Sequence, residues 1–221
     1  MAAIITEKFR IHNAEQFSES FSESSATTYY LTIGKPIAFT SDTSGGTDLS
    51  PPTPVDDVSS EYYAWDSMIA AKKITSSDIV RVIPRRNWAN STTFDMYEDN
   101  ISSSNTTTSG ATNLYDSTFY FMTSDFKVYK VLDNNGGTAF SGSEPTSTST
   151  TPFESGGYIL KYMYTLTTAQ VQNFLTTDFM PVATDSTVST AAVGGKIESV
   201  IVTAGSGYTN GTYYAPIHGD G

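Results

Sequence analysis

LYDSTFYFMTSDFKVYKVLDNNGG, residues 114–137, is the stretch of the sequence that decides the fold. Aromatic and β-branched residues dominate 119–122 and 126–132, and this composition predicts two strands joined by a turn. The stretch carries six aromatic side chains but no histidine, no cysteine and no pair of carboxylates set for catalysis. We interpret the rings as core and contact surface, because aromatic side chains bury large areas at a small cost in rotamer freedom.

The rest of the sequence predicts an α+β fold that is mainly β. Further strands are expected over residues 29–33, 79–83, 158–165 and 197–202, where β-branched and aromatic residues are concentrated. Several of these segments alternate apolar and polar residues, as strands of a half-buried sheet do. No repeat of 20 to 50 residues is visible in the sequence, so a repeat architecture is not expected.

Two short helices are predicted from their capping residues. Residues 12–23 favour a helix that begins at Asn13, whose side chain suits the cap position. Residues 167–175 favour another, because Thr167 and Gln170 have the spacing of a capping box.

The clearest helical pattern covers residues 55–74. Acidic residues lie near its start, and Lys72 and Lys73 lie near its expected carboxyl end, as the helix dipole favours. Four large apolar residues recur at helical spacing along it: Val58, Tyr62, Trp65 and Ile69.

The composition argues against several functional classes. The chain has 221 residues, with 12 basic and 23 acidic ones, a formal net charge of −11. We therefore expect no nucleic acid or membrane partner, since phosphate binding needs clustered positive charge and a membrane span needs a long apolar run. There is no cysteine, and His12 and His218 lack a neighbouring nucleophile or ligand pattern. We expect no catalytic residue, no metal, no cofactor and no small-molecule substrate.

Three tracts are rich in serine, threonine, asparagine and glycine: residues 40–54, 100–113 and 134–152. Such tracts contain little apolar area to offset the entropy of ordering. We expect surface excursions or arms that a partner orders. Within 133–137, DNNGG predicts a hairpin turn or bulge rather than a calcium loop, because the later ligands of such a loop are missing.

RVIPRRNW, residues 81–88, is the one local cluster of basic and aromatic residues. Proline fixes its own φ and favours an extended residue before it, so Pro84 should direct Arg85 and Arg86 away from the strand with Trp88 nearby. In an acidic chain, we expect the two guanidinium groups to clamp carboxylates at a domain junction or on a partner, one structural and one interfacial. Contact with nucleic acid is the less favoured interpretation.

Five segments occur in the order and approximate spacing of a known family: FRIHNAEQF, AWDSMIAAKK, VIPRRNW, GGYILKYMYTL and TTDFMPV. In these segments the chain resembles the baseplate wedge subunit of contractile-tailed, T-even-like bacteriophages, the product of gene eight, in the form seen in phages of cyanobacteria. The resemblance covers roughly residues 9 to 183. Family members continue beyond the segment that matches DFMPV, whereas this chain has a different sequence there. The resemblance therefore does not place the last strands or the dimer surface in this chain.

The resemblance implies a structural protein without enzymatic activity, located in the tail baseplate of the virion and assembled in the host cytoplasm. It implies a homodimer that contacts the products of genes seven, ten and six. It also implies a β-layered, sandwich-like domain over residues 1–85 plus 196–221, with an α/β domain over residues 86–195 inserted in it.

Six residues are our candidates for an interface or a domain junction: Arg85, Arg86, Trp88, Tyr115, Tyr120 and Tyr129. The alternative function is a carbohydrate-binding or glycan-cleaving tail module, because aromatic β-proteins with Ser/Thr-rich loops also bind sugars. A sugar site would require exposed aromatic rings beside Asp, Asn or Arg side chains in a groove.

Overall fold

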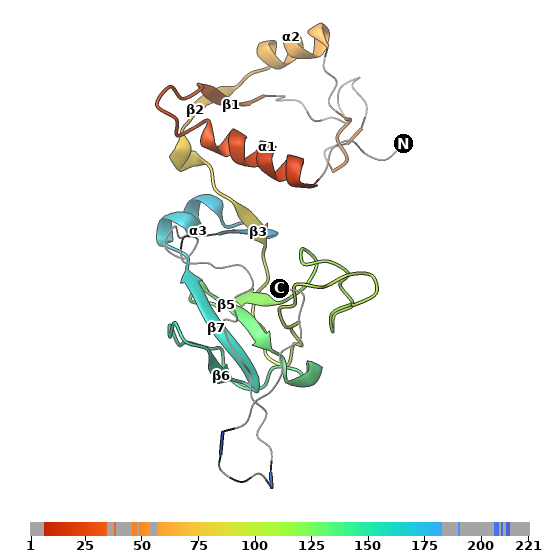
Figure 1. Cartoon of the computed structure of the whole chain (residues 1–221). Coiled ribbons are helices and arrows are strands. Elements are labelled where there is room, and N and C mark those ends of the chain that lie inside the picture. The colour runs from red at the N-terminus through yellow and green to blue at the C-terminus, as the bar shows by residue number, and fades with distance from the viewer. Residues whose placement is uncertain are drawn as a thin grey trace. The chain divides into compact units, whose positions relative to one another are not determined.

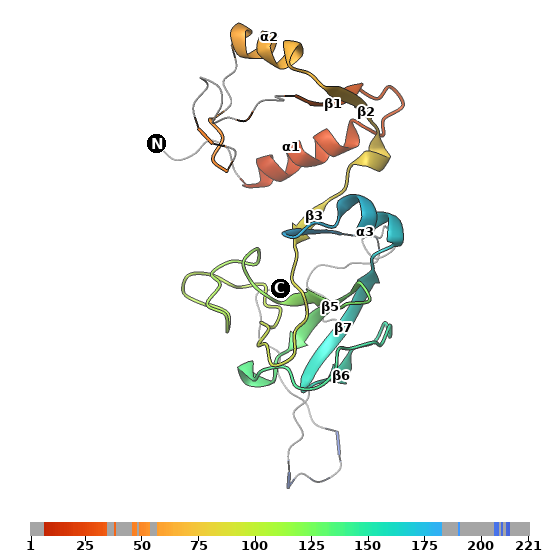
Figure 2. The ribbon, with the colours of Figure 1, turned by 180° about the vertical axis from the view of Figure 1, so that it is seen from behind.

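The computed structural model describes residues 7–34, 38, 46–47, 49–53, 57–182, 190, 206–207, 209 and 211–212. It divides into two compact units, Met1–Val80 (unit 1) and Arg81–Gly221 (unit 2), seen from two sides in Figure 1 and Figure 2. The predicted class, α+β and mainly β, is confirmed, since all strand pairs between the named strands are antiparallel and the helices are short.

The described part of unit 1 combines two α-helices with a two-stranded sheet (Figure 1). Strand β1, Tyr29–Ile33, pairs with strand β2, Ala70–Ile74, and has the bounds that the sequence predicts. The ring of Tyr29 packs against Phe21 of the segment after helix α1, with ring centroids 4.6 Å apart. This aromatic contact joins the first helix region to the sheet.

Helix α1, Glu7–Glu19, starts earlier than the sequence predicts. Asn13 therefore lies inside the helix and does not cap it. Asparagine is only a moderately poor helix former, and residues 7–19 contain neither proline nor glycine, so nothing in the segment stops the helix from extending toward its start.

The helix predicted over 55–74 is much shorter in the structure. Helix α2 covers Val58–Asp66, and Lys72 and Lys73, expected at its carboxyl end, lie in β2 instead. The main-chain N–H of Ile69 donates to the carbonyl of Ile33 at 2.8 Å, which begins the pairing with β1. Tertiary pairing with a strand far away in the sequence thus overrides the local helical spacing.

A 3₁₀ turn, η2, covers Ser76–Asp78, near the end of unit 1. Lys72 forms an ion pair with the carboxylate of Asp78, and the main-chain N–H of Thr75 also donates to it at 3.0 Å. These contacts, that of Lys72 first, lower the pKa of Asp78 to about 2.

Unit 2 is built on a four-stranded antiparallel sheet in the order β4-β5-β7-β6. The first two strands lie close to the predicted bounds, and the third matches them: β4, Tyr120–Met122, β5, Lys127–Asp133, and β7, Tyr158–Thr165. The sequence did not predict the short strand β6, Phe153–Ser155.

A second pair of strands joins the beginning of unit 2 to residues 179–181. Strand β3, Val82–Pro84, pairs with strand β8, Phe179–Pro181. The chain then continues beside β4, where Trp88 N donates to the carbonyl of Met122 at 2.8 Å. Helix α3, Thr168–Phe174, precedes β8 and has the predicted capping box, with Thr167 accepting from Gln170 N and Gln170 from Thr167 N.

Both faces of the four-stranded sheet are covered by apolar side chains. Neighbouring residues of a strand point to opposite faces. One cluster therefore contains Phe121, and the other contains Tyr120 and Met122. The remaining buried members of the first cluster are Phe94, Tyr129, Val131, Phe140, Tyr158 and Leu160, and those of the second are Val128, Leu166 and Met180.

The tract 134–152 is not the surface excursion that its composition suggests. Phe140 is buried in the first cluster, and the hydroxyl of Tyr129 donates to the carbonyl of Ser147 at 2.9 Å. One apolar ring and hydrogen bonds to the backbone thus fix a polar tract to the core. The predicted turn at 133–137 forms as the 3₁₀ turn η3, Asn135–Gly137, and the β5–β7 register shifts just before it, between Val131 and Asp133.

The predicted strand over 197–202 lies outside the described residues, as do most of residues 196–221. The division into a β-layered domain over 1–85 plus 196–221 and an inserted domain over 86–195 therefore stays a prediction.

Candidate interaction surface

Two of the six candidate residues, Tyr120 and Tyr129, lie in the core of unit 2 and offer no free surface. The hydroxyl of Tyr120 donates to the carbonyl of Pro84 at 2.7 Å, which ties β4 to β3. Burial, with the nearby Tyr162 and carboxylates adding to it, raises the pKa of Tyr129 to about 12. Both rings serve the packing of the sheet.

Arg85 connects the end of β3 with the turn before β8. Its main-chain N–H donates to the carbonyl of Asp178 at 2.7 Å, and its Nη1 donates to the carbonyl of Thr176 at 2.9 Å. Its Nε donates to the side chain of Asn87 at 3.0 Å. Among the described residues, the acceptors of this guanidinium group are a carbonyl and an amide rather than carboxylates.

Arg86 is brought together with Tyr115. Its Nη2 donates to the carbonyl oxygens of Tyr115 and Asp116, at 3.1 and 2.9 Å, and so holds the segment before β4. The ring of Tyr115 is exposed, whereas Trp88 packs edge-on against Phe140 with ring centroids 5.8 Å apart. Within the described part of the chain, neither arginine has a carboxylate partner, and the assignment of one to a partner surface stays a prediction.

We predict that Arg86→Lys lowers the free energy of unfolding of unit 2 by about 1–3 kcal/mol, because a single ammonium group does not reproduce two hydrogen bonds made by a planar fork. Urea unfolding followed by circular dichroism measures this change. Arg81→Lys, at an exposed arginine nearby, is the matched control and should unfold like the parent. Equal stability of Arg86→Lys and the parent would show that these contacts contribute nothing.

The sequence interpretation missed Asp95, a carboxylate that is 1% exposed. Ser109 donates to it twice, from N and Oγ, each at 2.7 Å, and Thr118 N donates at 2.8 Å and Ser117 Oγ at 3.1 Å. Burial alone would raise the pKa of Asp95, but the hydrogen bonds from Thr118 and Ser109 outweigh it and lower the pKa. The only local signal was an acidic residue between Phe94 and Met96.

Apolar side chains are distributed very unequally between the two units. Of the thirteen buried hydrophobic residues among those described, only Phe21 belongs to unit 1. Large hydrophobic side chains are instead exposed there, each by at least half. The exposed set among the described residues of unit 1, which we call the unit 1 apolar surface, consists of Phe9, Ile11, Phe17, Tyr30, Leu31, Ile33, Leu49, Val58, Tyr62, Trp65 and Ile69.

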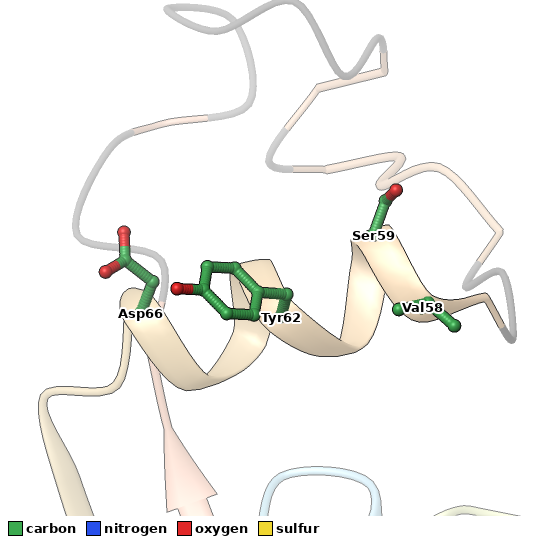
Figure 3. A pocket seen from close by; sticks show the side chains of 4 residues that line it. All are labelled: Val58, Ser59, Tyr62 and Asp66. Atoms are coloured by element: carbon green, nitrogen blue, oxygen red, sulfur yellow. The ribbon is translucent and has the colours of Figure 1, made fainter.

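Helix α2 carries the most exposed helical part of this surface. Val58, Tyr62 and Trp65 are 83%, 75% and 68% exposed. A hollow of about 430 Å³ lies beside the first two, and its lining includes Val58, Ser59, Tyr62 and Asp66 (Figure 3). In Figure 3 the ring of Tyr62 lies along the helix in the direction of Asp66.

The described residues offer neither a metal site nor a membrane span. No group of three or more His, Cys, Asp or Glu side chains is placed there to hold a metal ion. No described helix is long and apolar enough to cross a bilayer. His12 lies on the exposed surface of α1.

An apolar surface of this extent is typical of a subunit that is built into a larger assembly. The family model of Gp8 of bacteriophage T4 matches residues 3–141, which is more than half of the chain. The chain belongs to this family, that of the baseplate wedge subunit of T4-like phages, and is a structural component of the tail baseplate. The resemblance drawn from the sequence is thereby confirmed. No curated protein matches the chain.

Proposed function

We propose that the chain is a non-enzymatic subunit of the baseplate wedge that acts through protein–protein contacts, and that unit 1 carries the main contact surface. The single observation that supports this is the unit 1 apolar surface: among the described residues of unit 1, eleven large hydrophobic side chains are exposed and one is buried. Side chains that are this exposed add little buried apolar area to unit 1 and so contribute little to its own stability. It is stabilised when a partner covers this surface.

We further propose a homodimer, with the products of genes seven, ten and six as the other partners, and assembly in the host cytoplasm. Membership of the family supports association with other baseplate proteins, and β1 offers a surface for the dimer. Its side chains Tyr30, Leu31 and Ile33 are exposed, and a two-stranded sheet is marginally stable by itself. Two-fold pairing of such sheets would cover the same apolar residues on both copies.

We predict that the full chain at micromolar concentration is a dimer and that Leu31→Asp makes it monomeric, because a charge in an apolar contact must be desolvated. Size exclusion with light scattering gives the mass. Met163→Asp, at an exposed apolar residue of unit 2, is the matched control and should leave the dimer intact. A monomer mass for the parent chain across a tenfold range of concentration would refute the dimer.

The absence of enzymatic activity is part of the same proposal. It is supported by the family and by a sequence with no cysteine and with two histidines that lack a nucleophile or ligand pattern. His12→Ala and His218→Ala should therefore assemble like the parent. Cleavage of host polysaccharide by the purified chain, lost in a carboxylate variant, would overturn this part.

A further inference from the structure

Helix α2 presents one apolar stripe to solvent. Successive residues advance by about 100° around a helix, so Val58, Tyr62 and Trp65 fall within an arc of roughly 60°. All three side chains are largely exposed, and together they form what we call the α2 stripe. A stripe of this kind on a soluble helix normally faces a core, and here nothing among the described residues covers it.

Carboxylates border the α2 stripe on both sides. By the same helical geometry, Glu61 lies on one side of it and Asp66, with Ser59, on the other. Both acidic residues are exposed. The charge bias extends well beyond the helix, because residues 36–71 contain six acidic residues and no basic one.

We propose that the α2 stripe docks into an apolar groove of a different protein of the assembly, and that lysine and arginine residues border this groove. The inference rests on the proposed function and names the chemistry of one partner. An amphipathic helix that lays its apolar face into a groove is a common mode of recognition, and exposed Tyr and Trp side chains are the usual anchors. The rim of carboxylates selects a partner with the opposite charge.

A second copy of the chain fits this surface poorly. A two-fold contact of α2 with α2 would bring Glu61 and Asp66 close to the same carboxylates of the other copy. Like charges placed opposite each other in an interface cost several kcal/mol. The partner surface that fits is therefore basic at its rim, and it belongs to another protein.

The hollow beside Tyr62 gives this partner a specific contact. Its lining combines the apolar side chain of Val58 and the ring of Tyr62 with the hydroxyl of Ser59 and the carboxylate of Asp66 (Figure 3). A long basic side chain has the matching chemistry, since its aliphatic stem packs along a ring while its charged head pairs with a carboxylate. The rings of Trp65 and Tyr62 would supply most of the binding affinity. The carboxylates would set the register of the two surfaces and raise the association rate.

The first experiment places a photo-cross-linking benzoylphenylalanine at position 65 and isolates phage tails that contain the full chain. Irradiation and mass spectrometry then identify the cross-linked peptide. We expect a peptide from a different baseplate protein with lysine or arginine beside apolar residues. The matched control carries the same group at Phe179, an exposed aromatic position of unit 2 that is not among the six candidate residues. A cross-link from position 65 to a second copy of the chain, or no cross-link at all in intact tails, overturns the proposal.

The second experiment reverses the rim charge with Glu61→Lys and Asp66→Lys together. We expect incorporation into tails to fall at least about tenfold, since like charges at an interface cost more than the 1.4 kcal/mol that corresponds to a factor of ten. Glu98→Lys with Asp99→Lys makes the same change in net charge on unit 2 and should incorporate like the parent. Normal incorporation of the α2 variant into tails would refute the proposal that the carboxylates beside the α2 stripe select the partner.

A separate readout distinguishes this inference from the proposed function. The α2 variant should keep the helical circular dichroism and the dimer mass of the parent, because its substitutions lie on an exposed face. If it assembles normally while Leu31→Asp fails to assemble, only the assignment of α2 is wrong. If the parent chain itself is absent from purified tails, the proposed function fails.

Discussion

Phe121→Ala is expected to lower the free energy of unfolding of unit 2 by roughly 3–5 kcal/mol. Phe121 is fully buried in β4, and its ring contacts those of Phe94 and Phe140, with centroids 4.6 and 6.1 Å away. Removing it leaves a cavity between rings that come from separate segments of the chain. These rings cannot close the gap without moving the segments that carry them.

Urea unfolding followed by tryptophan fluorescence measures this change. The chain has two tryptophans, so a Trp65→Phe background leaves only Trp88, which packs against Phe140 in the affected core. Phe179→Ala is the matched control, because the ring of Phe179 is 41% exposed. A loss below about 1.5 kcal/mol for Phe121→Ala, within the range of a volume-conserving swap, would mean that this ring is not central to the core.

The second large effect is expected for Asp95→Ala, on the order of 3–5 kcal/mol. The substitution leaves four donor groups, from Ser109, Ser117 and Thr118, without their acceptor. Asp95→Asn should lose nearly as much, because an amide has one oxygen and brings two donors of its own. Asp99→Ala, at an exposed carboxylate, should be close to neutral.

The contribution of Asp95 should also depend on pH in a defined direction. Its folded pKa is lowered, so the stabilisation is complete above the pKa of the unfolded carboxyl, about 4. It is lost as the pH falls from there through the folded pKa. The difference in unfolding free energy between the parent and Asp95→Asn should therefore shrink below about pH 4. A difference that stays constant from pH 7 to pH 2.5 would contradict the ionised state of Asp95.

The parts of the fold that the sequence predicts well are those with local causes. Strand β1, strand β7 and the capping box at Thr167 depend on alternation and on residues three positions apart, and all three appear at the expected positions. The helix predicted over 55–74 is wrong at its carboxyl end, because residues 70–74 pair with a strand about forty residues earlier in the sequence. Strands β6 and β8 have three residues each, too few to show a period.

The candidate site was harder to predict for a related reason. Sequence gives the kind of side chain but not its tertiary acceptor. Arg85 and Arg86 were expected to meet carboxylates, whereas within the described part of the chain their guanidinium groups meet backbone carbonyls and the amide of Asn87. Tyr115 and Tyr129 lie in the same aromatic-rich stretch of the sequence, yet Tyr129 is buried and Tyr115 is exposed. The sequence shows that Val58, Tyr62 and Trp65 recur at helical spacing. It does not show whether these side chains face a core or the solvent.

The pairing of β3 with β8 has a consequence for synthesis of the chain. Arg85 and its acceptor Thr176 are 91 residues apart in sequence, so β3 leaves the ribosome long before its partner strand exists. At about 5–20 residues per second, this wait lasts on the order of 5–20 s. During that time unit 1 is already outside the ribosome with the unit 1 apolar surface uncovered. Partner proteins or chaperones can therefore bind unit 1 before β8 has been synthesised and unit 2 can complete its fold.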